Sequence, residues 1–429
     1  MNPLRKTYCR LFQACFRIAL PVLPYREPHP LATFEEAAAL LAEKGVRKPL
    51  IVTDGRIRAL GLTRPLEEAL AAQGIHVRVF DEVVPNPTIA NVEAARAAYL
   101  SHQCDALIAF GSGSAMDCAK AAGARVVRPN KPVQKMRGLL KVRRKLPLFL
   151  AIPTTAGTGS ETTLAAVITD SETHHKYPIN DFSLIPHYAV LDYRTTLDLP
   201  PHVTATTGMD ALVHAVEAYI GRSTTRETRA RAVEATALIH RYLQRAYEHP
   251  HDAEARKGML RAAYCAGIAF TKSYVGYVHG VAHSLGGQYG IAHGLANAVL
   301  LPYFLDEYGA SAEKKLAQLA REAGIVDANE DANEGADASS PQASDDAQAA
   351  RAFVEWVRAM NAALGIPDKL EGIREEDIPV MAAHADEESN PLYPVPKLMD
   401  AHELESMYYK VMTDPAHAAP TSPAARADA

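Results

Sequence analysis

Short apolar runs alternate with amphipathic stretches over the first half of the chain. Apolar runs typical of buried strands lie at 50–52, 77–80, 106–110, 148–152 and 188–191, and helical patterns lie between them at 66–73 and 89–101. An order of strand, helix and strand at this spacing predicts βαβ units and a mostly parallel sheet. The first half is therefore expected to be an α/β domain.

The pattern changes after Pro200 and Pro201. Long, Ala-rich helical patterns then dominate, at 205–219, 226–247, 253–270 and 352–363, and strand signals are few. This change predicts a domain boundary near residue 200. The expected division is an N-terminal extension at 1–30, an α/β domain at 31–200 and an all-helical domain at 201–429.

The N-terminal segment is basic and amphipathic. Five basic residues and no acid lie between Met1 and Arg26, and apolar residues fall near helical spacing at Leu4, Tyr8, Leu11, Phe12, Cys15, Ile18 and Ala19. Arg10 and Arg17 interrupt the apolar stretch, which argues against a signal peptide. We favour a helix docked on its own protein or on a sister subunit. Contact of residues 4–20 with a membrane surface is the alternative.

One segment accounts for the acidity of the chain. Residues 327–350 hold seven acids and no base, a composition typical of a disordered insertion, which we place at 326–350. Without those seven acids the formal charge changes from −5 to +2, with 45 bases against 43 acids. The chain therefore lacks the large basic excess that would indicate a nucleic-acid partner. Five scattered cysteines without a C-x-x-C pair predict reduced thiols and a cytoplasmic protein.

Histidines gather in a stretch without formal charge. Ser273 to Leu305 contains no Asp, Glu, Lys or Arg but includes His279, His283 and His293. Upstream, Asp210 and His214 are spaced by four, so they share one face of a predicted helix. A lone histidine in apolar surroundings is usually a core residue, but this grouping favours a metal site. One carboxylate and several imidazoles suit Fe²⁺ or Zn²⁺.

Two turns rich in glycine and hydroxyl groups follow strand-like runs. In the first, Gly111 and Gly113 precede a helix that we expect to begin near Ser114, with Asp117 completing a capping box. The second, 153–161, holds four hydroxyls and two glycines. Each alone is compatible with an ordinary turn, but together they favour a nucleotide cradle. Asp54 ends an earlier strand, where an acid accepts ribose hydroxyls and favours NAD over NADP.

These motifs resemble those of the iron-containing alcohol dehydrogenases, the metal-dependent family called group III. Thr206–Tyr219 resembles one family signature, and Val278–Gly286 with Ala292–Asn297 resembles the other. The similarity covers Pro49 to Met412 apart from the acidic insertion. The resemblance implies a dehydroquinate synthase-like fold, with an α/β dinucleotide-binding domain, an all-helical metal-binding domain and the active cleft between them.

The resemblance also implies the site residues. The metal ligands are expected to be Asp210, His214, His279 and His293, with His283 beside the metal as a candidate proton relay. The cofactor-contacting residues are expected to be Asp54, Asn86, Gly111, Ser112, Gly113, Ser114, Asp117, Thr154, Thr155, Thr158, Thr163 and Lys176. Ser112 departs from the glycine of the family, so its side chain either crowds the pyrophosphate or offers it a hydroxyl.

The implied activity is NAD(H)-dependent oxidation of an alcohol or reduction of an aldehyde. A divalent metal, Fe²⁺ before Zn²⁺, polarises the alcohol oxygen while hydride passes to the nicotinamide. The expected partners are a small alcohol or aldehyde and sister copies in a homodimer or larger homo-oligomer. Two alternatives remain: a polyol (glycerol, propanediol) or lactaldehyde oxidoreductase of the same superfamily, and a catalytically silent protein that serves assembly or sensing.

Overall fold

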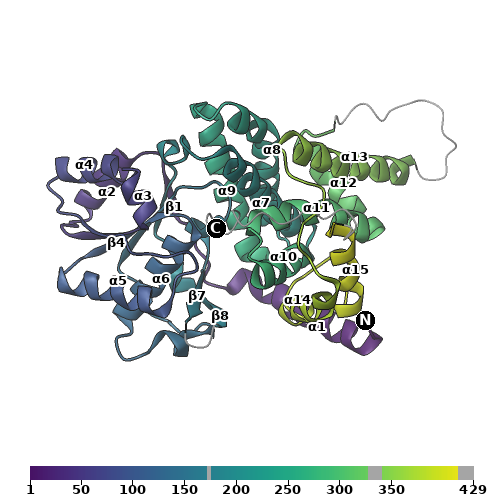
Figure 1. The fold of residues 1–429 in the computed structure, drawn as a ribbon, viewed down its shortest axis with the longest axis horizontal. Helices are drawn as coiled ribbons and strands as arrows, with labels where there is room; N and C mark the ends of the chain where they lie inside the picture. The colour runs from purple at the N-terminus through teal and green to yellow at the C-terminus, as the bar shows by residue number, and fades with distance from the viewer. Residues whose placement is uncertain (172–174, 327–340, 414–429) are drawn as a thin grey trace. The chain divides into compact units, whose positions relative to one another are not determined.

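The computed structural model describes residues 1–171, 175–326 and 341–413, which form two compact units (Figure 1). The α/β unit comprises Pro24–Asp198. The helical unit joins Met1–Leu23 to the described residues from Leu199 onward. The N-terminal segment thus belongs to the same unit as the second half of the chain.

The α/β unit is built on a six-stranded sheet. Its strands are, in spatial order, β1 (His29–Leu31), β9 (Tyr188–Val190), β6 (Leu148–Pro153), β4 (Ala106–Gly111), β2 (Pro49–Val52) and β3 (Arg78–Phe80). Every neighbouring pair is parallel. All residues of β2 and β4 are buried, which explains why these strands appear in the sequence as unbroken apolar runs. The predicted mostly parallel sheet is confirmed.

Helices cover both faces of this sheet. They are α2 (Phe34–Glu43), α3 (Gly55–Ala59), α4 (Arg64–Ala72), α5 (Ile89–Ser101) and α6 (Gly113–Val127). Leu107 and Ala109 of β4 join the core formed with α5 and α6, whereas Ile108 and Phe110 join the core formed with α2 and α4. The alternation of side chains along β4 therefore contributes to two separate cores.

A second, three-stranded sheet in this unit was not predicted. It contains β5 (Gly138–Leu139), β8 (His175–Asn180) and β7 (Ala165–Asp170), with β7 and β8 antiparallel. The burial along β7 is mixed, so the strand lacks the continuous apolar run that marks the central strands.

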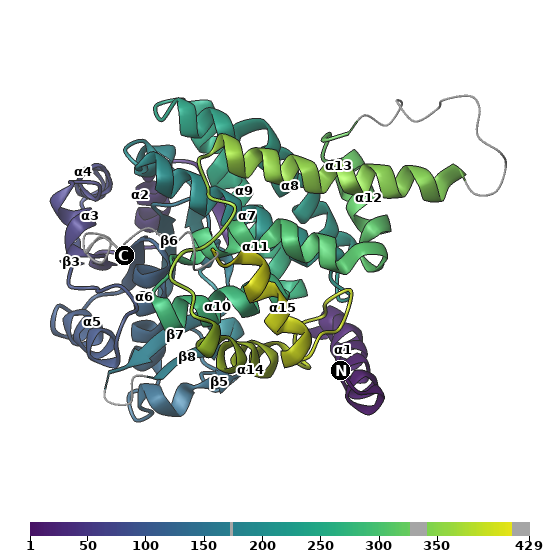
Figure 2. The ribbon, with the colours of Figure 1, turned by 45° about the vertical axis from the view of Figure 1, so that its right-hand side comes forward.

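The helical unit contains ten α-helices among its described residues. They are α1 (Pro3–Ala19), α7 (Pro201–Ile220), α8 (Arg226–Glu248), α9 (Ala253–Ser273), α10 (Tyr277–Tyr289), α11 (His293–Tyr308), α12 (Glu313–Glu322), α13 (Pro341–Ala363), α14 (Ile378–Ser389) and α15 (Ala401–Val411). Helices α7, α8 and α9 pack on one another, and α10 packs against α11 and α14 (Figure 2). Helix α7 is buried on almost every side, so polar groups on it are shielded from water.

The acidic segment is only partly described. Residues 327–340, which hold much of the insertion predicted at 326–350, lie outside the described residues. Residues 341–350 form the first turns of α13, so the predicted insertion extends too far. There Ala349 and Ala350 are buried, and Asp346 forms a 2.7 Å ion pair with Arg321 of α12. Packing against α12 therefore extends the helix beyond its apolar repeat.

Candidate functional site

Three helices bring the four expected metal ligands together. Asp210 and His214 lie one turn apart on α7, His279 lies on α10, and His293 begins α11. One donor atom from each lies within 4.8 Å of the others. Oδ1 of Asp210 is 3.4 Å from Nε2 of His293 and 4.0 Å from Nε2 of His279, and its Oδ2 is 3.9 Å from Nδ1 of His214. The predicted spacing of four does place two ligands on one face.

The donor atoms of this cluster fit a divalent cation. Nδ1 of His214 and Nε2 of His279 are buried and accept no hydrogen bond from any described residue. Buried polar atoms are nearly always partnered, so two such nitrogens facing one carboxylate fit the coordination of a divalent cation. Burial lowers the pKa of both imidazoles. They are therefore neutral near pH 7, the form that binds Fe²⁺ or Zn²⁺.

A buried carboxylate that the sequence analysis missed orients one of these rings. Glu217 lies on α7 just beyond His214 and accepts hydrogen bonds from the N–H groups of Gly276 (2.8 Å) and Val278 (2.9 Å). Its Oε2 is 2.6 Å from Nδ1 of His279. Burial raises the pKa of Glu217 to about 8, although the two backbone donors oppose that shift. This contact holds His279 with Nε2 toward Asp210.

Small residues let the three helices approach. A glycine directly follows His279 and His293 in the sequence. A Cβ on Gly280 would lie 2.3 Å from Oγ of Ser389, and a Cβ on Gly294 would lie 2.5 Å from the carbonyl oxygen of Thr206. Any larger residue would push α10 from α14 and α11 from α7, which would separate the donors.

Two further side chains fix the cluster. Asn297, one turn beyond His293, donates a 2.7 Å hydrogen bond to Oδ1 of Asp210. The ring of Phe270 stacks on His214 with centroids 4.2 Å apart. The four donors are thus held by contacts from α7, α9, α10 and α11. Neither contact is visible in a sequence pattern, because both join residues far apart along the chain.

His283 lies beside the cluster and has partners of its own. Its ring stacks on that of His293, with centroids 5.2 Å apart, and its Nδ1 is 2.6 Å from Oε1 of Glu388. Tyr393 donates a 2.7 Å hydrogen bond to the same carboxylate oxygen. Burial alone would raise the pKa of Glu388, but the charge and hydrogen bond of His283 and the bond from Tyr393 lower it. Glu388 is therefore a carboxylate that orients a half-exposed imidazole.

In the α/β unit, Asp54 and the two turns rich in glycine and hydroxyl groups follow the carboxyl ends of adjacent strands β2, β4 and β6. Asp54 follows β2, and its carboxylate accepts a 2.9 Å hydrogen bond from the N–H of Ile57 and lies beside Gly111. Gly111 has φ +151°, and a Cβ there would lie 2.8 Å from Cβ of Ala115. A glycine is therefore required at this strand-to-helix turn.

Helix α6 begins one residue earlier than predicted. Ser112 is its N-cap and forms no side-chain capping bond, and the helix starts at Gly113. The expected capping box of Ser114 and Asp117 is therefore wrong. Ser112, Gly113 and Ser114 are partly exposed, so the free N–H groups of the first turn are open to an anion.

The second turn divides into outward and inward hydroxyls. Thr155 and Thr158 are partly exposed, whereas Thr154 and Thr163 are buried. The backbone N–H of Thr154 donates to the carbonyl of Gly111 at 3.1 Å, which joins the two turns. Separately, Lys176 donates a 2.7 Å hydrogen bond to Asn86, so these two expected residues lie together.

Two expected cofactor residues make inward contacts instead. Asp117 accepts a hydrogen bond from the N–H of Val167 at 3.1 Å. Thr163 accepts a 2.8 Å bond from the ammonium group of Lys120, which is completely buried on α6. Lys120 also donates to the carbonyls of Ser160 (2.8 Å) and Ala165 (2.9 Å). The ammonium group thus ties the hydroxyl-rich turn to α6.

Comparisons with known proteins agree with this geometry. A family model described as iron-containing alcohol dehydrogenase matches residues 31–193, and one described as the C-terminal part of the Fe-containing alcohol dehydrogenase family matches residues 204–412. The chain is similar to NAD-dependent methanol dehydrogenase of Bacillus methanolicus, at 35% identity over 83% of this chain and 91% of that protein. It is also similar to 1,3-propanediol dehydrogenase of Citrobacter freundii, at 35% identity over 87% of this chain and 93% of that protein.

A solved structure is similar to this chain in fold as well as in sequence. The structure titled as 1,3-propanediol oxidoreductase matches with a TM-score of 0.82 and 32% identity, over 90% of this chain and 99% of that chain. Both halves of the sequence thus match one kind of protein, in the residue ranges where the two units were found.

Proposed function

Because the chain belongs to the iron-containing alcohol dehydrogenase family, we propose that it interconverts small alcohols and aldehydes with NAD(H) and a divalent metal. The observation that carries this proposal is the cluster of Asp210, His214, His279 and His293, with two buried imidazole nitrogens that lack a partner among the described residues. Fe²⁺ is the metal favoured by the family, and Zn²⁺ suits the same donors.

Different residues would bind the metal and the cofactor in this reaction. When bound, the metal would polarise the oxygen of the alcohol or aldehyde, with NAD⁺ as hydride acceptor in oxidation and NADH as hydride donor in reduction. Glu217 keeps His279 aimed at Asp210, so the donors are arranged before the metal arrives. The open start of α6 suits the pyrophosphate of the cofactor. The carboxylate of Asp54 suits ribose hydroxyls and disfavours a 2′-phosphate, which supports NAD over NADP.

The proposed function is tested by metal analysis of the protein purified without oxygen, together with an NADH-oxidation assay. The aldehyde panel includes short primary aldehydes, 3-hydroxypropanal and lactaldehyde, which separates the simple alcohol substrate from the polyol and lactaldehyde alternatives. We expect about one metal ion per chain and turnover that chelation abolishes and Fe²⁺ or Zn²⁺ restores. No metal and no turnover after both ions have been supplied would instead support a catalytically silent protein.

We propose that His283 carries the proton released when an alcohol is oxidised. Its half-exposed ring lies beside the ligand cluster and is held by Glu388, an arrangement suited to proton transfer with solvent. Replacing His283 with alanine is expected to lower kcat by about 10²-fold or more and to remove one limb of its pH profile. Glu388→Gln is expected to shift that limb while retaining bound metal.

The matched control for this pair is exposed His402→Ala. A His283→Ala enzyme with the normal rate and pH profile would show that another group, or water alone, moves the proton. Loss of metal in His283→Ala would show that the ring is a ligand instead.

We also propose a cytoplasmic homodimer or larger homo-oligomer. The five cysteines are unpaired in the structure, and four of them are buried, as expected for a protein kept in a reducing compartment. The family resemblance supports the oligomeric state, and sedimentation velocity measures it directly.

A further inference from the structure

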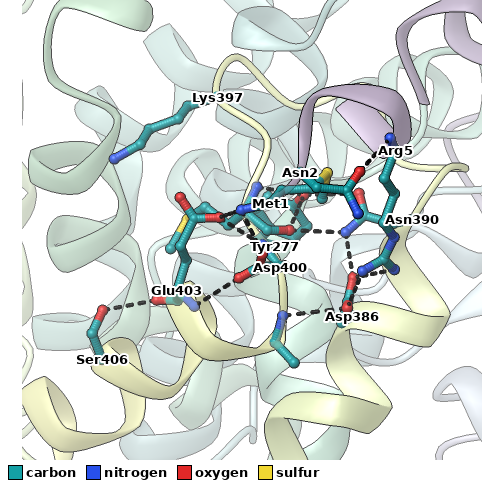
Figure 3. A network of polar contacts seen from close by, with 12 residues as sticks. Met1, Asn2, Arg5, Tyr277, Asp386, Asn390, Lys397, Asp400, Glu403 and Ser406 are labelled. Carbon is teal, nitrogen blue, oxygen red and sulfur yellow. Dashed lines mark hydrogen bonds and ion pairs between the residues drawn. The ribbon is translucent and has the colours of Figure 1, made fainter. Parts of the chain in front are cut away.

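Helix α1 docks on the helical unit through polar side chains together with buried Cys9 and with Phe16, whose ring contacts that of Tyr274. Arg5 forms a bidentate ion pair with Asp386 at 2.7 and 2.8 Å (Figure 3). Arg10 donates to the carbonyls of Val395 and Pro396 at 2.7 and 2.8 Å. The side-chain amide of Gln13, which is buried, donates to two carbonyls of the same segment, those of Pro391 and Tyr393. The docked helix that we favoured from the sequence is thus observed, against α14 and the segment that joins α14 to α15.

The opposite side of the same helix is apolar and exposed. It presents a stripe with helical spacing that continues into the next turn, consisting of Leu4 (86% exposed), Tyr8 (57%), Leu11 (63%), Ile18 (78%) and Val22 (81%), with exposed Cys15 between them. Surface helices normally bury their apolar side and expose their polar side. Helix α1 instead leaves this apolar stripe exposed, while Cys9 and Phe16 on its other side contact the helical unit. Exposed apolar groups gathered in this way indicate a surface that something covers.

Basic groups lie near both ends of this helix, with Lys6 in its first turn and Arg17 in its last. Lys6 and Arg17 of α1 are exposed, as are Arg222 and Arg229. Lys315 of α12 donates a 3.0 Å hydrogen bond to the carbonyl of Ile220, two residues before Arg222, and burial together with the charges of Arg229, Arg222 and Arg17 lowers its pKa to about 8. Within the described parts of the chain, none of these three arginines forms an ion pair. Positive charge without an ion-pair partner among the described residues therefore lies near the end of the apolar stripe.

We propose that the stripe of Leu4, Tyr8, Leu11, Ile18 and Val22 binds the surface of a bilayer that contains anionic lipids. An apolar stripe with flanking cations matches acyl chains below and phosphate groups above. Pairing with a second copy of α1 fits less well, because the helix has no acid and two copies would place cations against cations. None of the described helices is long and apolar enough to cross a membrane.

The test is sedimentation of the full-length enzyme with vesicles of phosphatidylcholine alone and of phosphatidylcholine mixed with phosphatidylglycerol. We expect binding to the anionic vesicles to be at least about tenfold tighter than to the neutral ones, and to weaken at high salt. The double variant Leu11→Ser/Ile18→Ser is expected to weaken binding by about tenfold or more. Lys6→Gln/Arg17→Gln is expected to remove most of the salt dependence.

The control is Leu60→Ser/Leu100→Ser, which removes two exposed leucines from the α/β unit and should leave binding unchanged. Retained dehydrogenase activity in every variant shows that each is folded, and this readout is independent of vesicle binding. Equal binding to both vesicle types, or binding unaffected by Leu11→Ser/Ile18→Ser, would overturn the proposal. So would a smaller oligomer in sedimentation velocity of that variant without lipid, which would assign the stripe to a contact between copies.

Discussion

Asp210→Asn is expected to yield a folded protein with almost no bound metal and with kcat/KM lowered by about 10³-fold or more. Asn keeps the shape of the side chain but removes the negative charge that faces three imidazoles. Polarisation of an oxygen by a metal contributes several kcal/mol, and each 1.4 kcal/mol corresponds to about tenfold in rate. Metal content, measured on the same preparation as the rate, checks the result.

Two companion variants sharpen this test. Glu217→Gln leaves all four donors in place but weakens the hold on His279, so we expect metal affinity to fall about 10- to 100-fold, with activity restored by excess metal. Asp198→Asn, at an exposed position, is the matched control and should change nothing. Full metal content in Asp210→Asn would mean that the ion does not bind to this cluster.

Lys120→Met is expected to destabilise the α/β unit by about 3 kcal/mol or more. Methionine fills most of the space of the lysine stem, but it leaves the carbonyls of Ser160 and Ala165 and the hydroxyl of Thr163 without their donor. Each buried polar group left unsatisfied costs about 1–3 kcal/mol. Because the lost bonds hold the hydroxyl-rich turn, NADH affinity should fall together with the midpoint of urea unfolding.

The stability lost in Lys120→Met should also grow as the pH rises. Burial raises the pKa of Asp117 from 3.8 to about 6 and that of Glu161 from 4.5 to about 7, and the charge of Lys120 opposes both shifts. A carboxyl group whose pKa is higher in the folded than in the unfolded protein contributes its full stabilisation below its unfolded pKa. That stabilisation is lost as the pH rises through its folded pKa. Without Lys120 the pKa values of both carboxyl groups in the folded protein rise further. The free energy of unfolding that Lys120→Met loses should therefore be smallest near pH 5 and larger near pH 8.

Exposed Lys48→Met is the control for both measurements. A loss of under about 1 kcal/mol at pH 8 would mean that water or a backbone shift replaces the ammonium group. A loss of stability with unchanged NADH affinity would mean that the hydroxyl-rich turn does not contribute to the cofactor site.

The elements that the sequence predicted well are those whose own pattern of apolar residues reflects how they are buried. Strands β2, β4 and β6 are covered on both faces, so their apolar runs are continuous, and α7 to α9 have long helical repeats. The antiparallel pair β7 and β8 was missed because its strands gain their stability from each other and from α6. Pairing of this kind leaves only a weak pattern in either strand.

The same distinction applies to the site. Asp210 and His214 share a helix face, and the histidines of α10 and α11 stand in a stretch without formal charge, so these ligands could be predicted. The groups that orient them could not. Glu217 meets His279 across 62 residues of sequence, and Glu388 meets His283 across 105. Lys120 appears in the sequence as an ordinary helix residue, and only the packed structure shows that it is buried.

The docking of α1 also sets an order of events during synthesis. Arg5 and its partner Asp386 are 381 residues apart, so a ribosome adding about 5–20 residues per second makes the second roughly 20–80 s after the first. The whole α/β unit is made between them and can fold first. Through that interval the basic, apolar helix has no docking site on its own chain. The helical unit therefore becomes complete only after α14 and the segment that follows it have been made and can contact α1.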